Sequence, residues 1–226
     1  MKSKKEVLNK IEEIIKVFEG NKNIISIYLY GSILSNKFKP SKSDVDLLII
    51  VDDSSKPFVF IKNIKKLFNS FKNIKFDVNI VFLSEFKKRW HIYRPPSYFI
   101  GIKYKSKLLL GKDVLRGVKD SELSKDKVYK RIVDLSQSSR GIYINSKESD
   151  FWASKYVGWL KMVVLEILFL TGEFELDFST GLRKIKRKYR DLNFLDKLNK
   201  NKLNMRDINE IAEEIRVFFY KNFIKK

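Results

Sequence analysis

The sequence predicts an α+β protein in which a mixed β-sheet flanked by helices is followed by an all-helical C-terminal part. In the first half, short runs of β-branched and aromatic residues alternate with helical patterns. In the second half, apolar residues recur only at helical spacing. The texture changes after residues 111–114, so we expect one domain over residues 1–115 and a second over residues 116–226.

Local patterns define each element of the first half. Apolar residues recur at helical spacing from Val7 to Phe18, and Gly20 ends that helix. Residues 45–51 are nearly all aliphatic, which is typical of a central strand covered on both faces. The other expected elements are strands over 24–30 and 75–82, helices over 59–71 and 84–90, and strand-like or irregular apolar structure over 99–110.

Two apolar stripes support the helices of the second half. One stripe consists of Ile132, Leu135, Ser139 and Ile142, and the other of Ile208, Ile211, Ile215 and Phe218. Both follow helical spacing, so each predicts a helix with one buried face. The expected helices cover residues 125–145, 150–170, 180–192 and 206–223.

Composition excludes several kinds of site and compartment. The chain has no cysteine and a single histidine, which excludes disulfides, thiolate metal sites and histidine-cluster metal sites. No secretory signal is visible, and the longest apolar run, 157–170, carries Lys161 and Glu166 and is too short to span a bilayer. We therefore expect a cytoplasmic protein with no membrane partner.

The formal net charge of +20 leaves two interpretations open. A basic protein attracts polyanions, which makes nucleic acid a candidate partner. Lysine greatly outnumbers arginine, however, and isoleucine and asparagine are also abundant. A general compositional bias toward these residues explains the charge equally simply, without a dedicated nucleic-acid surface.

Three carboxylates lie at predicted strands. Asp44 and Asp46 are two residues apart, so both point to the same side of a strand. Crowded carboxylates repel one another, and a divalent cation relieves that repulsion. Asp77 lies in the predicted strand 75–82 and reaches the same place if the two strands are neighbours. Three such acids suit a site with two Mg²⁺ ions, so Asp44, Asp46 and Asp77 are the candidate metal-binding and catalytic residues.

Gly31 and Ser32 follow the predicted strand 24–30. A glycine here lets the backbone approach a phosphate closely, and serine adds a hydroxyl donor. We expect a short helix or turn to begin at this pair, with backbone N–H groups that favour an anion. The structural alternative is an ordinary turn and helix cap.

At these residues the chain resembles the DNA polymerase β-type nucleotidyltransferases. The resemblance rests on the runs LYGS at 29–32 and SDVDLLII at 43–50, with Asp77 as the expected third acid. It implies a triphosphate site at Gly31, Ser32 and Ser43. Many members carry an arginine shortly after the Gly-Ser pair; here Lys37 stands in that stretch and is the candidate for its role.

The helical half resembles, more loosely, the C-terminal domain of aminoglycoside nucleotidyltransferases. Such domains often begin with a segment like LLGKDVL at 109–115. In that group a lysine after the long apolar helix meets the triphosphate, and Lys184 is its possible counterpart. The alternative for Lys184 is a solvated basic helix face.

Three further sets have both a functional and a structural interpretation. The first set is Trp90, His91 and Tyr93. Its functional interpretation is stacking against a nucleotide base, and its structural interpretation is anchoring of a loop to the core. The stripe of Phe151, Trp152, Tyr156 and Trp159 lines a ligand or packs between helices. Glu148 and Asp150 either act as a base toward the acceptor, as an acid of the helical half does in aminoglycoside-modifying enzymes, or are ordinary helix-start acids.

The resemblance and the carboxylates together predict a Mg²⁺-dependent transfer of a nucleoside monophosphate from an NTP, ATP being the first choice, to an acceptor hydroxyl. Pyrophosphate leaves in that reaction, and the helical half closes the substrate cleft. The acceptor is a small molecule, an RNA or a protein. The alternative from another class is a catalytically silent, antitoxin-like scaffold or nucleic-acid-binding module, which has no need of clustered carboxylates.

Overall fold

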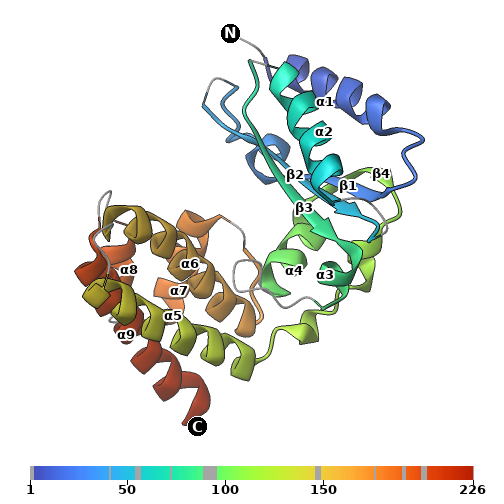
Figure 1. The fold of residues 1–226 in the computed structure, drawn as a ribbon. Coiled ribbons are helices and arrows are strands. Elements are labelled where there is room, and N and C mark those ends of the chain that lie inside the picture. The colour runs from blue at the N-terminus through green and yellow to red at the C-terminus, as the bar shows by residue number, and fades with distance from the viewer. Residues whose placement is uncertain are drawn as a thin grey trace. The chain divides into compact units, whose positions relative to one another are not determined.

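The computed structural model describes residues 3–40, 42–53, 57–71, 73–88, 96–145, 149–175, 177–189, 192–199 and 203–225. The chain divides into two compact units, Met1–Lys119 and Asp120–Lys226 (Figure 1). The first unit is built on a β-sheet and the second is helical.

A mixed four-stranded sheet forms the centre of the N-terminal unit. Its order is β3 (Phe76–Phe82), β2 (Val45–Val51), β1 (Ile24–Tyr30) and β4 (Lys107–Gly111). Strand β1 runs antiparallel to both β2 and β4, while β2 and β3 are parallel and joined through a helix. The mixed sheet predicted from the sequence is therefore confirmed.

One face of the sheet packs against α1 (Lys4–Phe18) and α2 (Pro57–Ser70), which lie together over it in Figure 1. Alternate strand residues such as Ile27, Leu47 and Ile49 point into this core and are fully buried. Apolar residues at helical spacing complete the core from the side of the two helices. The residues between them, including Asp46, therefore belong to the opposite face.

The opposite face lies beside α3 (Leu83–Lys88) and α4 (Pro96–Lys105). The rings of Phe86 and Phe99 meet edge to face at 5.3 Å and join these two helices. Tyr98 of α4 contacts Tyr30 at the end of β1, with ring centroids 6.1 Å apart. This contact places α4 next to the strand end that leads into Gly31.

The prediction of strand-like structure over 99–110 is correct only at its end. Residues 107–111 form β4, but Pro96–Lys105 is a helix. Its tyrosine, phenylalanine and isoleucine residues favour strands by propensity, and tertiary packing overrides that weak preference. Pro96 at the first helical position was the signal for a helix, because its fixed backbone angle suits that place.

The C-terminal unit consists of helices packed on one another. Its α-helices are α5 (Lys125–Asn145), α6 (Ser149–Leu170), α7 (Phe178–Lys188), α8 (Asn193–Leu198) and α9 (Met205–Phe219), with a π-helical turn at Tyr220–Ile224. The helix expected over 180–192 is wrong at both ends, because α7 begins at Phe178 and stops at Lys188. Among the described residues, no helix has the length and hydrophobicity needed to cross a bilayer.

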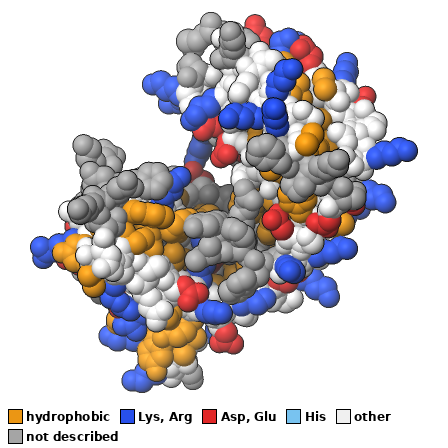
Figure 2. Space-filling model, viewed as in Figure 1, with side chains coloured by type: hydrophobic (Ala, Val, Ile, Leu, Met, Phe, Trp, Pro, Cys, Tyr) orange, Lys and Arg blue, Asp and Glu red, His pale blue; other side chains and the backbone are white. Residues whose placement is uncertain are grey.

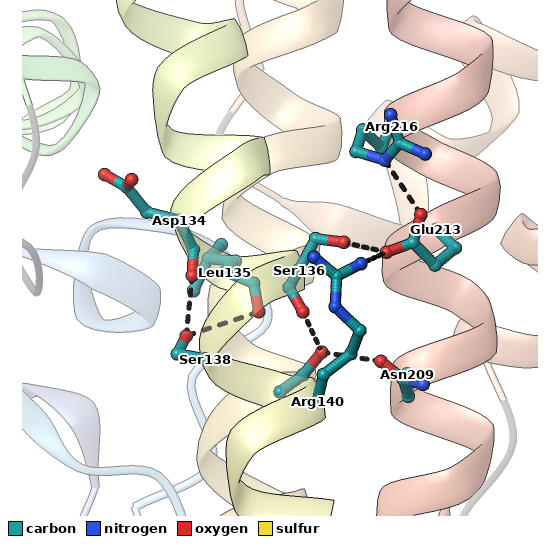
Figure 3. Close-up of polar contacts among 9 residues, drawn as sticks. Asp134, Leu135, Ser136, Ser138, Arg140, Asn209, Glu213 and Arg216 are labelled. Carbon is teal, nitrogen blue, oxygen red and sulfur yellow. Dashed lines mark hydrogen bonds and ion pairs between the residues drawn. The ribbon is translucent and has the colours of Figure 1, made fainter.

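Polar contacts join α5 to α9 beside their apolar contact surface (Figure 3). Glu213 on α9 accepts hydrogen bonds from Ser136 and Arg140 on α5 and from Arg216 Nε at 2.8 Å. Ser139 donates to the side chain of Asn209 at 3.1 Å. Although burial opposes the shift, the bonds from Ser136 and Arg216 lower the pKa of Glu213. The carboxylate therefore stays ionised and holds the two helices in one register.

A buried ion pair joins α5 to α6. Arg131 donates to Glu166, and the two side chains are 9% and 1% exposed. Most of α6 around Glu166 is apolar and buried, including Val163, Val164 and Ile167. Such a pair favours one alignment of the two helices, because moving one helix would leave a buried charge without this partner.

Candidate active site

Gly31 lies in the left-handed region, with φ at +79°, directly after β1. A Cβ added at this position would sit 2.0 Å from Asp46 Oδ2 and 2.8 Å from its Cγ. Both the backbone angle and the contact therefore require glycine. The close approach of Gly31 to Asp46 brings the Gly-Ser turn against the carboxylates.

Asp46 and Asp77 are direct partners in the parallel ladder between β2 and β3. The strands are thus neighbours, as the predicted metal site requires. Asp46 is half-buried and Asp77 is exposed. Burial, together with the charges of Asp77 and Asp44, raises the pKa of Asp46 from 3.8 to about 6. Burial is the largest cause of this shift, and the neighbouring carboxylates add to it because like charges disfavour the ionised form.

Asp44, the residue before β2, is paired with Lys75, the residue before β3. The Lys75 ammonium lies 2.9 Å from Asp44 Oδ1 and 3.0 Å from Oδ2. Only the contact with Oδ2 has hydrogen-bond geometry. The Oδ1 atom is buried and has no hydrogen-bond partner. The bond to Asp44 and its charge raise the pKa of Lys75. Sequence reasoning did not select Lys75, although its position two residues before Asp77 places it on the same side of the strand.

A second feature missed from the sequence is a hydrogen-bonded cluster on the carboxylate face. Asn79 Nδ2 donates to the Tyr30 hydroxyl at 2.7 Å, and the hydroxyls of Tyr30 and Tyr98 are 3.0 Å apart. Burial raises the pKa of Tyr30 to about 12, with Asp46 adding to the effect. The cluster ties β1, β3 and α4 together next to the two aspartates. Asn79 follows Asp77 by two residues, and that spacing was the available signal.

The residues proposed for the triphosphate adjoin the same strand ends. Residues 31–34 form a single turn of 3₁₀ helix rather than an extended helix, so no long helix dipole begins here. The carbonyl of Ser32 accepts bonds from Ser35, and the Ser43 hydroxyl accepts from the Lys39 backbone at 3.0 Å. Ser43 thus closes the loop before Asp44, and Lys37 is exposed in that loop.

The other candidates come from other parts of the chain. Lys184 lies on α7 of the helical unit, 3.7 Å from Glu175 and 3.9 Å from Glu173. Trp90, His91, Tyr93 and Glu148 lie outside the described residues, as do the side chains of Asp150 and Phe151. In the aromatic stripe on α6, Tyr156 is buried in the helical core. Its ring centroid lies 4.8 Å from that of Trp159.

The carboxylates fit Mg²⁺ in kind. They offer hard oxygen ligands, a buried Oδ1 of Asp44 without a hydrogen bond, and an Asp46 carboxylate that the charges of Asp77 and Asp44 repel. Across the described ranges, no group of three or more acidic, histidine or cysteine side chains is already close enough to hold an ion. Asp46 and Asp77 come from neighbouring strands, and the carboxylates would have to approach one another to hold an ion.

Comparison with known proteins agrees with this geometry. The family described as "Polymerase beta, Nucleotidyltransferase" matches residues 12–93. This part of the chain is therefore similar to polymerase β-type nucleotidyltransferase domains. The match contains Gly31, Ser32 and all three aspartates, so the resemblance predicted from the sequence motifs is confirmed.

Among solved structures, the fold resembles that of spectinomycin adenyltransferase AAD(9) from Enterococcus faecialis, crystallised with ATP and spectinomycin. The TM-score is 0.56 at 14% sequence identity, and the likeness covers 94% of this chain and 97% of that one. At this identity it shows the fold alone, and the α+β architecture with a helical C-terminal part is confirmed. No curated protein sequence matches the chain.

On the one face that Figure 2 shows, the distribution of charge gives no independent support for a nucleic-acid partner. On the face shown in Figure 2, Lys and Arg side chains are spread over both units and interspersed with acids. A spread of this kind is what a lysine-rich composition produces. The nucleic-acid interpretation of the +20 charge therefore stays a prediction.

Proposed function

We propose that the protein transfers a nucleoside monophosphate from an NTP, with ATP the first candidate, to a hydroxyl of a small molecule and releases pyrophosphate. The observation that carries the proposal is the ladder pair of Asp46 and Asp77 beside Gly31. It combines paired acids with a turn that lets a phosphate approach.

Asp44 and Asp46 would hold two Mg²⁺ ions, with Asp77 completing the ligands on the acceptor side. The ions supply neutralisation of the triphosphate and activation of the attacking hydroxyl. Asp77 is the exposed member of the set and is suited to accept the proton of the acceptor hydroxyl. Asp46 is the half-buried member and fixes the position of the set relative to Gly31.

Backbone and side-chain donors would hold the triphosphate. Gly31 and Ser32 offer N–H groups and a hydroxyl at the end of β1, and Ser43 keeps the preceding loop closed. Lys37 adds positive charge in that loop. Lys184, which lies near Glu173 and Glu175, is a further candidate for binding the triphosphate.

The helical unit would bind the acceptor. The structurally similar adenyltransferase was crystallised with ATP and with spectinomycin, a small molecule, and a small-molecule acceptor is the corresponding proposal here. RNA and protein acceptors, which the positive charge permits, are tested as alternatives. Steep weakening of RNA binding with salt would favour the RNA acceptor.

Transfer of label from α-³²P-ATP to acceptors in a cell extract, with Mg²⁺ present, tests the proposal. We expect a labelled small molecule from the wild-type protein and about a thousandfold less from Asp46→Asn. Asp126→Asn, which changes an exposed acid on α5, is the matched control and should keep full activity. Label in RNA or protein would change the acceptor class. Equal labelling by wild type and Asp46→Asn would refute the catalytic assignment and favour a silent module.

A further inference from the structure

A cation already lies at the carboxylate site, and it belongs to the chain itself. The ammonium of Lys75 is within 3.0 Å of both oxygens of Asp44. Among the described basic side chains, Lys75 is the one paired with any of the three aspartates. The charge of Asp77, two residues further along the chain, also contributes to the raised pKa of Lys75. Lys75 thus lies where the negative charge of the site is concentrated.

The Lys75 backbone is fixed, whereas its side chain is exposed. Its carbonyl accepts a hydrogen bond from Val45 N at 2.8 Å, which joins the starts of β2 and β3. The side chain is 77% exposed, so it can change rotamer without disturbing the core. A lysine ammonium on a flexible four-carbon stem can exchange one anionic partner for another.

Asp44, the partner of Lys75, has one carboxylate oxygen to which the lysine donates no hydrogen bond. Asp44 Oδ1 is buried and has no hydrogen bond, although the ammonium is 2.9 Å away. A lysine at this distance without hydrogen-bond geometry neutralises the oxygen only in part. A divalent cation would satisfy it fully, but would have to displace the ammonium from the same carboxylate.

We propose that Lys75 is a built-in counter-ion that occupies the cation position beside Asp44 in the free protein and moves to a phosphate oxygen of the nucleotide when Mg²⁺ binds. The inference rests on the proposed nucleotidyl transfer and adds a residue to it. A single lysine then has two opposite effects. It weakens binding of Mg²⁺ to the free protein and strengthens binding of the nucleotide. Lys75 is thus a nucleotide-binding residue that exchanges one ionic partner for another and does not bond to the reacting atoms.

Opposite changes in two affinities provide the test, using Lys75→Gln in the full chain. Calorimetric titration of the free protein with MgCl₂ should show affinity raised about two- to fivefold, the strength of an exposed ion pair. In the transfer assay, KM for ATP should rise about tenfold while kcat changes little, because a charged phosphate contact is lost. Lys75→Arg keeps a cation at Asp44 and should not raise the Mg²⁺ affinity.

Lys10→Gln is the matched control. It removes an exposed lysine whose ammonium is 2.6 Å from Glu13 on α1, on the face of the sheet away from the carboxylates. Both affinities should stay at wild-type values. An unspecific effect of one lost positive charge would instead appear equally in both variants.

The outcomes separate this inference from the proposed function. If Mg²⁺ binding depends on Asp46 but is unchanged or weaker in Lys75→Gln, the counter-ion role is wrong and the metal site stands. A KM for ATP that does not change would also overturn the transfer to phosphate. Both proposals fail if the substitution Asp46→Asn does not abolish Mg²⁺ binding in the wild type or in the Lys75→Gln variant.

Discussion

Asp46 is a residue whose ionised form the free protein disfavours. Its pKa is raised from 3.8 to about 6 by burial and by Asp77 and Asp44. The native state therefore holds this proton more tightly than the unfolded chain does. Between these two values, the native state binds more protons, so the free energy of unfolding falls as pH rises. The stabilisation from protonated Asp46 is complete below 3.8 and is lost above about 6.

We predict that Asp46→Asn is more stable than the wild type in EDTA at about pH 7.5, by about 1 kcal/mol after allowance for solvent screening. At about pH 4 the advantage should vanish, since the wild-type carboxyl is then protonated too. Urea unfolding at both values measures the difference. Glu12→Gln, at an exposed carboxylate on α1, controls for the lost charge. A difference that is the same at both pH values would contradict the raised pKa.

At the scale of single residues, the sequence predicted the side chains that share a strand face, because alternation along a strand is regular. Asp44, Asp46 and Asp77 were selected in this way. Lys75 and the Tyr30–Asn79 bond were missed for one reason. Their significance depends on which rotamer a long side chain adopts and on which strands are neighbours. Neither property is encoded in local spacing.

At the scale of elements, a strong periodicity of apolar residues predicted the long helices correctly, whereas the weak strand propensity of single residues gave a wrong prediction. The helices α5 and α9 matched because their apolar stripes persist over several turns. The helix α4 was missed because its aromatic and β-branched residues favour a strand when tertiary contacts are ignored. In α4 the apolar residues are buried on several sides, so no amphipathic stripe marks the helix.

The ion pair of Arg131 and Glu166 gives a prediction about how α5 and α6 hold together. Arg131→Met should lower the free energy of unfolding by about 3 kcal/mol, because Glu166 is 1% exposed and would lose its charged partner. Adding Glu166→Leu should restore most of the loss, since two apolar side chains then pack together. Chemical denaturation of the single and double variants measures both effects.

An exposed pair on α9 is the control for that experiment. Arg206 lies 3.3 Å from Glu210, one turn further along the helix. Arg206→Met should change stability by less than about 0.5 kcal/mol, because solvent screens such pairs. If the double variant at Arg131 and Glu166 were no more stable than the single one, the pair would have a role beyond neutralising a buried charge.

At the scale of the whole molecule, the change of texture along the sequence predicted a sheet-based part followed by a helical part. The contiguous core of the first unit is formed by residues between Val7 and Leu110. It includes residues of α1 and α2, on the face of the sheet opposite the carboxylates. No residue of that core comes from the helical unit. We therefore expect the first unit to fold by itself.

We predict that a fragment of residues 1–119 unfolds cooperatively and binds Mg²⁺ with the affinity of the full chain, yet transfers no nucleotide to a small-molecule acceptor. Circular dichroism during urea unfolding and calorimetry measure the first two properties. Asp46→Asn in the same fragment is the control for specific binding. A fragment without a cooperative transition would show that the helical unit is needed for the fold itself.

The ladder between β2 and β3 constrains which insertions the gene can tolerate. The two acids come from strands separated in sequence by α2, and only the pairing of Asp46 with Asp77 brings them together. Residues added to the turns around α2 leave that pairing intact. One residue inserted between Lys75 and Asp77 would turn the acid to the opposite face of the sheet, into the core beneath α2. Changes of chain length during evolution should therefore gather in the turns, while the short run from Lys75 to Asn79 keeps a constant length.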